Sequence, residues 1–325
     1  SRPPLPPDPK LSGTMRRART SPSQHGPGRR LLLALLVRGG HGASWVDPCE
    51  EAVAQQASAS VNQSVLDEVL RTHVRHGEIG GIQTTLVDYA ALRQDPSRLR
   101  EYLRQLCDVD VHQMAPAEAL AVLVNAYNAI MLAIVVHYAP AGSVTELHAR
   151  VPGGSIWTHP FATLGGERVS LDDVEHRLIR RGGFASRAGA AGRVHAAINC
   201  ASLSCPDLLP EAFRASDLDN QLTAATQGWL ANPTKNPGPD GSGAIVLSKI
   251  FEWYGGDFQA TAGSVQAFVR TYSSWQFSDG ATLRFADYDW SLNAVGGFSS
   301  AGALHRFRPA VGALGVLALA MACQG

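Results

Sequence analysis

The sequence carries no excess of charge of either sign. It has 28 lysine and arginine residues against 28 aspartate and glutamate residues, which gives a formal net charge of zero. Proteins that bind nucleic acids or anionic membranes through their overall charge have a clear positive excess. We therefore expect no nucleic-acid partner.

The motifs of several large enzyme classes are also missing. The sequence contains no phosphate-binding loop, no glycine fingerprint for dinucleotides, no Gly-x-Ser-x-Gly elbow and no internal repeat. The missing motifs argue against nucleotide chemistry and against serine hydrolases. No cofactor is therefore expected.

The sequence does contain enough apolar material for a core. Apolar residues make up 45% of the chain and charged residues 17%, a balance that disordered chains do not have. Helical patterns dominate before residue 156, and short strand patterns appear after it. We predict a single α+β domain over residues 44–295, with a helical first half packed on a small mixed or antiparallel sheet.

The N-terminal segment predicts export. Residues 1–14 hold five prolines and precede the first methionine, so they are excluded from the fold. Residues 15–43 place basic residues before the apolar run 31–37 and small residues after it, which is the order of a secretory signal peptide. A disordered basic arm is the alternative interpretation.

The C-terminal segment has the composition of an anchor signal. Residues 296–325 contain small residues, a short polar spacer and then the uncharged run 309–322, which is the order of a glycolipid-anchor signal. A buried or frayed terminal helix is the alternative. The two ends together predict a secreted or cell-surface protein that attaches to a membrane through its C-terminal tail.

Cysteine usage agrees with an exported protein but leaves the pairing open. The chain has five cysteines, Cys49, Cys107, Cys200, Cys205 and Cys323. If the tail is removed, four remain, and four cysteines permit three pairings that the sequence cannot choose between.

A long apolar segment predicts a central helix. The middle of the segment 115–138, residues 121–136, is apolar on all sides apart from Asn125 and Asn128, and a helix that is apolar all round is buried. The two asparagines share a face at a spacing of three residues, and buried amides must find hydrogen-bond partners. We interpret them as supporting residues in a structural hydrogen-bond network.

A second helix is predicted after the capping residue Ser170. Its apolar stripe contains Leu171 and Val174, and Glu175 falls inside this stripe with His176 at its edge. A carboxylate on a core-facing side must be paired or neutralised. We expect Glu175 to be buried, with Arg193, His195 or Lys249 as its partner.

The segment 193–199 alternates in the manner of a strand. Arg193, His195 and Asn199 fall on one face, and Cys200 follows on the other. A turn rich in small polar residues, 201–206, comes next and carries Cys205. In this interpretation Cys200 and His195 point to opposite faces and cannot pair.

Five strings of the sequence resemble one family. They are residues 124–129, 170–176, 193–206, 247–258 and 288–293, and together they are similar to the family known as domain of unknown function 547. The resemblance covers about residues 66–293. It implies occurrence in secreted bacterial proteins and in eukaryotic proteins joined to other modules, and it implies no assigned activity.

The polar residues of these strings suggest a thiol enzyme. Such an enzyme brings together a cysteine, a base and an orienting group. We predict a thiol-dependent hydrolase or acyltransferase that acts on a small molecule or peptide. Its predicted catalytic residues are Cys205 as nucleophile, His195 or His176 as base and Glu175 as orienting group. The predicted supporting residues are Asn125, Asn128, Arg193, Asn199 and Cys200.

Other interpretations of the same cluster remain open. Cys200 and Cys205 form a disulfide, or Cys200 is a small buried apolar residue, or the cluster is a structural network. The protein is then a non-catalytic extracellular interaction module. His176, His195 and the two thiols are zinc ligand types, but their spacing fits no standard zinc signature, so no metal is expected.

Overall fold

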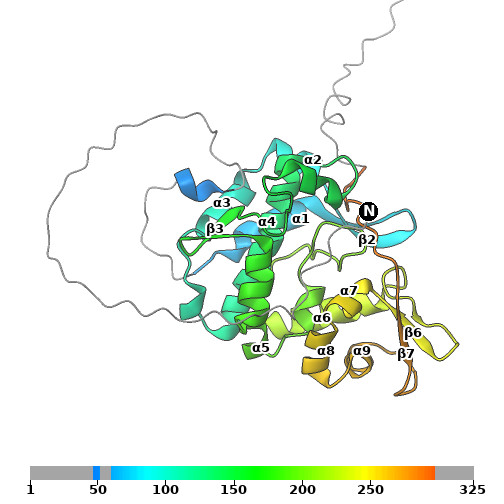
Figure 1. Ribbon diagram of the computed structural model, residues 1–325. Helices are drawn as coiled ribbons and strands as arrows, with labels where there is room; N and C mark the ends of the chain where they lie inside the picture. The colour runs from blue at the N-terminus through cyan, green and yellow to red at the C-terminus, as the bar shows by residue number, and fades with distance from the viewer. Residues whose placement is uncertain (1–46, 52–59, 297–325) are drawn as a thin grey trace, which may run out of the picture.

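The computed structural model describes residues 47–51 and 60–296, and the predicted α+β fold is confirmed there (Figure 1). The predicted signal peptide, the segment before it and nearly all of the predicted anchor segment lie outside the described residues.

Helices are the most abundant regular structure in the described chain. The α-helices are α1 (Gln63–His73), α2 (Tyr89–Gln94), α3 (Ser97–Gln105), α4 (Pro116–Tyr138), α5 (Phe184–Arg187), α6 (Leu218–Ala231), α7 (Lys249–Trp253), α8 (Gly255–Ala262) and α9 (Val265–Tyr272). Four short 3-10 helices are η1 (Pro48–Glu51), η2 (Val111–Gln113), η3 (Val144–Arg150) and η5 (Arg193–Ala196). The element η4 (Asp173–Arg181) is a π-helix.

The strands form three small sheets rather than one. They are β1 (Val74–Ile79), β2 (Ile82–Val87), β3 (Ala162–Leu164), β4 (Glu167–Val169), β5 (Gly238–Pro239), β6 (Ala244–Leu247) and β7 (Thr282–Phe285). The pairs β1–β2 and β3–β4 are antiparallel hairpins. In the third sheet β6 lies between β5 and β7, antiparallel to β5 and parallel to β7.

The central helix α4 organises the core. It begins with Pro116, and the missing N–H of this proline costs nothing because the first N–H groups of a helix have no partner within the helix. The helix ends at Tyr138, and the next residue, Ala139, has a left-handed φ of 46°. Every residue from 119 to 136 is buried. By length and composition α4 could cross a membrane, but protein surrounds it, as expected for a core helix.

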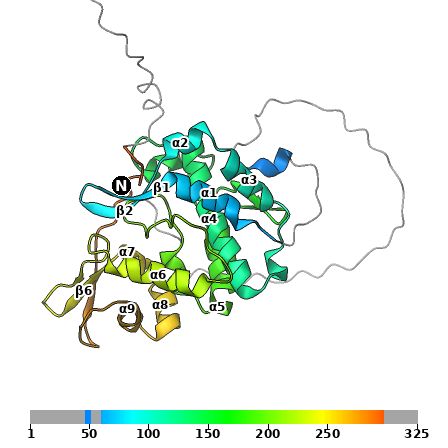
Figure 2. The same cartoon turned by 180° about the vertical axis from the view of Figure 1, so that it is seen from behind.

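A second, smaller core lies under α7, α8 and α9. Its aromatic side chains stack closely, with Trp229 and Phe251 ring centroids 4.7 Å apart and nearly parallel. Phe258 and Phe268 complete the cluster at 4.8 Å from each other. In opposite views the helices α2 and α3 lie at one end of the molecule, and α8 and α9 lie at the other (Figures 1 and 2). The chain between these ends therefore connects the larger core around α4 with the smaller core under α7, α8 and α9.

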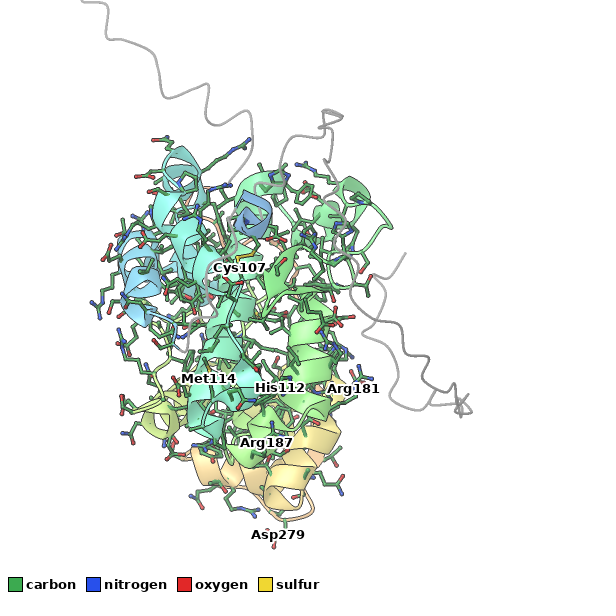
Figure 3. All side chains as sticks on the ribbon, turned by 90° about the vertical axis from the view of Figure 1, so that its left-hand side faces the viewer. Cys107, His112, Met114, Arg181, Arg187 and Asp279 are labelled. Atoms are coloured by element: carbon green, nitrogen blue, oxygen red, sulfur yellow. A yellow bond between two sulfur atoms is a disulfide. The ribbon has the colours of Figure 1, made fainter. Side chains whose placement is uncertain are left out.

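The 3-10 helix η2, before α4, packs against α5 through an aromatic contact. The His112 ring of η2 lies 5.4 Å from the Phe184 ring of α5, and the Arg187 guanidinium, also on α5, lies 4.3 Å from the Phe184 ring. Figure 3 shows His112 and Arg187 close to each other. This contact fixes η2 against α5.

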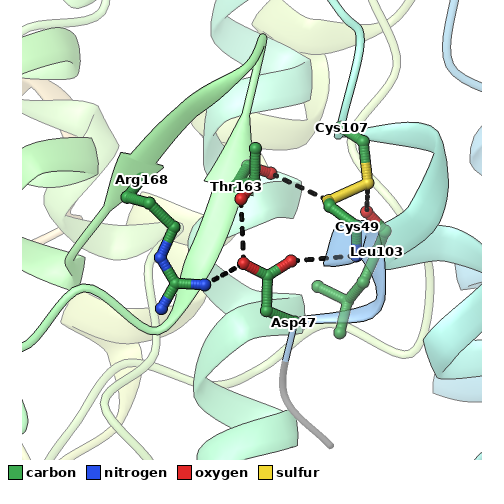
Figure 4. Close-up of a disulfide and its surroundings, with 6 residues drawn as sticks. All are labelled: Asp47, Cys49, Leu103, Cys107, Thr163 and Arg168. Carbon is green, nitrogen blue, oxygen red and sulfur yellow. Dashed lines mark hydrogen bonds and ion pairs between the residues drawn. A yellow bond between two sulfur atoms is a disulfide. The ribbon is translucent and has the colours of Figure 1, made fainter. Parts of the chain in front are cut away.

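A disulfide ties the N-terminal segment to α3. Cys49 bonds to Cys107, and the Asp47 carboxylate beside it accepts bonds from Cys49 N at 3.0 Å and Thr163 Oγ1 at 2.8 Å (Figure 4). Asp47 also pairs with Arg168. Cys200 and Cys205 are free thiols, so the alternative in which a disulfide joins them is wrong.

Removing this disulfide should lower stability. Replacing Cys49 and Cys107 together by serine frees a loop with a sequence separation of 58. Chain entropy alone predicts a loss of about 4 kcal/mol in the free energy of unfolding. Denaturant unfolding measures it, with Cys200→Ser as the matched variant that removes a thiol but no crosslink. An unchanged free energy in the double variant would contradict the role of the disulfide.

Candidate functional site

One cavity of about 330 Å³ gathers most of the chemically interesting side chains. Six parts of the chain supply its walls: the centre of α4, residues 155–158, the π-helix η4 with the residue before it, the segment 195–205, residues 250–254 around α7, and residues 288–290. The lining residues are Tyr127, Ser155, Trp157, Thr158, Asp172, Glu175, His176, His195, Ile198, Cys200, Cys205, Ile250, Trp253, Tyr254, Tyr288 and Trp290.

The predicted strand over residues 193–199 is wrong. The chain forms the 3-10 helix η5 and then an irregular segment, and every residue from 193 to 199 is buried. Since both sides of the segment face the interior, its alternation does not separate core from solvent. Ala196, Ala197 and Asn199 also have low strand propensity. Consequently the inference that His195 and Cys200 face opposite sides of a strand fails, and both line the cavity.

Two asparagines attach this irregular segment to the central helix. Asn128 on α4 donates to Ala197 O at 3.0 Å and accepts from Asn199 N at 2.9 Å. Asn199 donates to Pro206 O at 2.7 Å and accepts from Ala201 N at 2.8 Å. The supporting roles proposed for these amides agree with this geometry. The turn that carries both thiols is thus closed on itself and fixed to α4.

The other asparagine of α4 holds a different segment. Asn125 donates to Phe213 O at 2.8 Å and accepts from Phe213 N at 2.9 Å, and it also donates to Gln63. It therefore supports the chain before α6 and is absent from the cavity wall.

The thiol-bearing turn is strained and held from a second side. Ala201 has a φ of 64°, a left-handed conformation that a residue with a Cβ adopts at a cost. The C-terminal segment pairs with this turn, since Asn293 N donates to Ala201 O at 3.0 Å and Leu203 N donates to Ser291 O at 2.9 Å. This pairing brings Tyr288 beside Cys200.

A buried lysine closes the end of the turn. Lys235 is 3% exposed, and its ammonium donates to Cys205 O at 2.6 Å, Asp207 Oδ1 at 2.6 Å and Thr84 Oγ1 at 2.8 Å. All three donors of the ammonium are used, as a buried charge requires. Lys235 therefore links the hairpin β1–β2 to the residues after Cys205.

Cys200 is the thiol with the properties of a nucleophile. It is partly exposed, and its Sγ lies 3.1 Å from Ser202 Oγ and 3.3 Å from Tyr288 Oη. Burial would raise its pKa, but hydrogen bonds from the Cys205 thiol and from Ser202 and Tyr288 outweigh burial and lower the pKa below the ordinary thiol value. Donors around a sulfur stabilise the thiolate, which is the reactive form.

Cys205 has the opposite properties, although the sequence favoured it as nucleophile. It is 4% exposed, and its Sγ accepts a bond from Cys200 N at 3.0 Å. Burial raises its pKa well above the ordinary value, and the neighbouring Cys200 sulfur raises it further. The turn does fold back as expected, but it buries Cys205 beneath Cys200. The structural features expected of a nucleophile therefore lie on Cys200.

The predicted helix after Ser170 forms as a π-helix. The cap is present, because Ser170 N donates to Asp173 Oδ2 at 3.0 Å and Asp173 N donates to Ser170 Oγ at 3.0 Å. A π-helix turns less per residue than an α-helix, and such segments often occur at functional sites. As a result Glu175 and His176 are buried equally, each 7% exposed, and both line the cavity.

The burial of Glu175 is confirmed, but its expected partners are wrong. Arg193 pairs with Asp219 at 2.8 Å, His195 pairs with Asp257 and Lys249 pairs with Glu252. Glu175 instead has a side-chain hydrogen bond with Tyr254, and its Oε1 has no hydrogen-bond partner. Burial raises the pKa of the Glu175 carboxyl to about 7, and the bond with Tyr254 opposes this rise.

His195, which lines the cavity, pairs with Asp257, which does not. His195 Nε2 lies 2.8 Å from Asp257 Oδ2, and Arg180 Nε donates to the same oxygen at 2.6 Å. Burial would raise the pKa of Asp257, but the bonds to His195 and Arg180 lower it far below its usual range. Asp257 is therefore ionised and accepts the Nε2 proton of His195. The buried Nδ1 of His195 has no partner.

Both histidines are neutral near pH 7. Burial lowers the pKa of His195, against the opposing effect of Asp257. Burial and then the nearby Arg180 lower the pKa of His176 to about 4. Arg180 NH1 lies 3.0 Å from His176 Nδ1, which accepts this bond in the neutral ring. Neither histidine therefore supplies a positive charge to the cavity.

Aromatic rings form one wall of the cavity. The Trp253 and Trp290 rings are stacked with centroids 5.9 Å apart, and Tyr288 lies 4.6 Å from Trp290 and 4.9 Å from Trp253. Trp157 extends the wall at 6.3 Å from Trp290. On the opposite side the Tyr254 ring stacks on His195 at 4.2 Å. Such a wall favours ligands with apolar or flat surfaces.

The sequence analysis missed several of these residues. Tyr254, Asp257 and Tyr288 lie in the strings 247–258 and 288–293, which were used for the family resemblance but not for the site. Arg180 lies one π-helical turn after Glu175. The only available signal was the density of polar and aromatic residues in those strings, because their contacts span more than 60 residues.

Metal binding finds no support in the described part of the chain. Within residues 47–51 and 60–296, no three His, Cys, Asp or Glu side chains are grouped as metal ligands.

The stability difference made by Glu175→Gln should depend on pH. The pKa of Glu175 is raised from 4.5 in the unfolded chain to about 7 in the folded protein. The folded protein therefore keeps a proton that the unfolded chain releases, and stability falls as pH rises through this window. Glutamine does not ionise, so the variant should gain up to about 3 kcal/mol relative to the natural protein between pH 5 and pH 8.

Thermal or denaturant unfolding of the two proteins across this pH range measures the difference. Glu78 lies exposed on β1, and Glu78→Gln is the matched control, for which a nearly constant difference is expected. If the Glu175→Gln difference is also constant with pH, Glu175 is not a buried carboxyl with a raised pKa.

Comparison with known proteins identifies the central part of the chain. Residues 111–230 match the family described as Protein of unknown function, DUF547, which confirms the resemblance over a shorter span than residues 66–293. No curated protein and no solved structure matches the chain. The matched part holds Glu175, His195 and both cavity thiols, whereas the aromatic wall from α7 and residue 290 lies beyond it.

Proposed function

We propose that this chain, a member of the DUF547 family, is a cysteine-dependent acyl-transfer enzyme, either a hydrolase or an acyltransferase. One observation carries the proposal: the partly exposed Cys200 sulfur, surrounded by hydrogen-bond donors, opens into a cavity together with a carboxyl whose pKa is close to neutral. A reactive thiol needs a lowered pKa and access to a substrate. An acid–base group works best when its pKa lies near the working pH.

The roles follow from the two pKa shifts. Cys200 is the nucleophile in place of Cys205, because it is the exposed and more acidic thiol. Glu175 is the proton donor and acceptor rather than an orienting group, and the negative charge of Cys200 is among the causes that raise its pKa. A thiolate and a carboxylic acid can therefore coexist near neutral pH.

The proposed reaction uses each group twice. The Cys200 thiolate adds to an ester or amide carbonyl, a C–S bond forms, and the leaving alcohol or amine departs with the proton of Glu175. Water or another acceptor then attacks the thioester and gives its proton to the Glu175 carboxylate. The C–S bond breaks, the thiolate returns, and all atoms and protons are accounted for.

His195 is assigned to positioning the acceptor. Asp257 fixes the ring so that its Nε2 carries the proton and its Nδ1 remains an acceptor without a partner. An N–H or O–H of the substrate or of water can donate to Nδ1. His176 is bonded to Arg180 and has a pKa of about 4, so it is not assigned a role in proton transfer.

The disulfide supports the proposed localisation. Cys49–Cys107 is a bond that persists in oxidising compartments and is rare in the cytosol. Together with the signal-like order of residues 15–43 it favours export, to the medium or to the cell surface. The proposed substrate is then an extracellular ester or amide, either a small molecule or a peptide.

The reactivity of the two thiols tests the proposal directly. In the native protein, alkylation by iodoacetamide should modify Cys200 first, with half of the maximal rate at a pH well below about 8.5, the free-thiol value. Tyr288→Phe should move this midpoint upward because it removes a donor to the sulfur. Peptide mass spectrometry of samples taken at each pH assigns the modification to Cys200 or Cys205.

An activated ester separates catalysis from mere reactivity. With p-nitrophenyl acetate, the natural protein should release nitrophenol in a burst and carry an acetyl group on Cys200, whereas Cys200→Ala should show no burst. Glu175→Gln should keep the burst and lose most of the subsequent turnover, because the acetyl-enzyme lacks its proton acceptor. Cys205→Ala leaves the nucleophile in place and should retain a burst, but the burst should need a higher pH, because the variant removes a hydrogen-bond donor to the Cys200 sulfur.

Slow alkylation of both thiols with an ordinary midpoint would favour the interaction-module alternative. In that case the cluster around Glu175 and Cys200 is a structural network, and no acetyl-enzyme forms.

A further inference from the structure

The walls of the cavity have an unusual charge composition. Asp172 and Glu175 contribute two carboxylates, and no lysine or arginine lies among the lining residues. Aromatic rings make up much of the remaining surface, and the face of an aromatic ring carries partial negative charge. The cavity therefore disfavours anionic ligands and favours cations.

Glu175 has one oxygen that no group in the described part of the chain satisfies. The residue is 7% exposed, and its buried Oε1 has no hydrogen-bond partner. His176 Nδ1 lies 3.7 Å from this oxygen, but that nitrogen accepts a bond from Arg180 and the ring is neutral near pH 7. A buried carboxylate oxygen without a partner costs stability unless a ligand supplies a donor or a positive charge.

The nearest protein cation is already engaged. Arg180 uses its Nε and NH2 groups on Asp257, at 2.6 and 3.3 Å, and its NH1 group on His176 at 3.0 Å. It influences Glu175 only through its field, which lowers the pKa of the carboxyl less than burial raises it. The positive charge that Glu175 requires is therefore not supplied by residues 47–51 or 60–296, and we take a ligand as its source.

We propose that the cavity binds the ammonium group of a positively charged ligand, held over the aromatic wall and beside Glu175. The inference deepens the proposed function and rests on it in taking this cavity as the substrate site. The face of an aromatic ring attracts an ammonium most strongly when water is excluded, and the carboxylate adds a direct charge interaction.

A cation binds best to the carboxylate form of Glu175, which in the proposed reaction is the form present after the leaving group has taken the proton. The carboxyl is protonated before it donates to the leaving group and is a carboxylate afterwards. The free protein reaches the same ionised state above pH 7, since the pKa of Glu175 is about 7. Cation binding should therefore strengthen as pH rises from 6 to 8.

Other titratable groups face Glu175 and could contribute to this pH dependence. They are Asp172, His176 and Arg180 from the same helical segment, Tyr254, Cys200, and Tyr127 on α4. His176 and Arg180 do not titrate between pH 6 and 8, and burial raises the pKa of both tyrosines above that window. The Cys200 thiol is removed in the test, and Asp172→Asn measures the effect of the second carboxylate.

The test compares choline with its neutral carbon isostere, in which carbon replaces the charged nitrogen. The charge of choline does not change with pH, so any pH dependence reports on the protein. Both probes are titrated into Cys200→Ser protein at pH 6 and pH 8, with calorimetry and tryptophan fluorescence as readouts. We expect choline to bind at least about tenfold more tightly than the isostere at pH 8, and less tightly at pH 6.

Glu175→Gln in the Cys200→Ser background should remove most of this selectivity and its pH dependence. Glu78→Gln in the same background is the matched control and should leave both unchanged, because Glu78 is exposed on β1. Equal binding of the two probes, or choline binding that survives Glu175→Gln, overturns the inference. The test does not need the thiol, so its failure is separate from failure of the acyl-transfer proposal, which the alkylation and ester experiments decide.

Discussion

The bonds between Asn128 and the segment 197–199 are the attachment on which the rest of the site depends. They fasten an irregular stretch of backbone to the most rigid element of the molecule, because α4 is buried along its whole central length. Irregular buried backbone is costly unless its polar groups are satisfied, and side-chain amides can satisfy a donor and an acceptor at once. The left-handed Ala201 and the position of Cys200 follow from this attachment.

A second set of bonds arranges the charges. Arg180 forms hydrogen bonds with both Asp257 and His176, and Asp257 in turn accepts a hydrogen bond from His195. One guanidinium therefore positions a carboxylate and, directly or through that carboxylate, two neutral imidazole rings. This arrangement uses up the positive charge on the side away from the aromatic wall. Glu175 is left without a counter-charge although it is buried, and its carboxyl becomes the group with a pKa near neutral. The same cause, burial with one missing partner, supports both its acid–base role and its attraction for a cation.

The elements that local pattern determines could be predicted from the sequence. The central helix and the burial of Glu175 follow from periodicity, and the structure confirms them. The segment 193–199 could not be predicted, because its alternation suggested a strand while burial on both sides selected another backbone. The hydrogen-bond partners of the site residues were harder still to predict, because Asp257 lies 62 residues from His195 and Tyr288 lies 88 residues from Cys200. Only the folded chain brings such residues together.

The two thiols of one turn differ because the turn orients them differently. Cys205 lies inward, where Lys235 fixes its carbonyl and the Cys200 N–H donates to its sulfur, while burial keeps the thiol protonated. Cys200 lies toward the cavity, where hydroxyl donors surround its sulfur. The protonated Cys205 thiol donates a hydrogen bond to the Cys200 sulfur and stabilises its thiolate. The raised pKa of Cys205 therefore helps to lower the pKa of Cys200. A sequence shows two equivalent cysteines five positions apart, and the difference in chemistry arises only from the backbone that separates them.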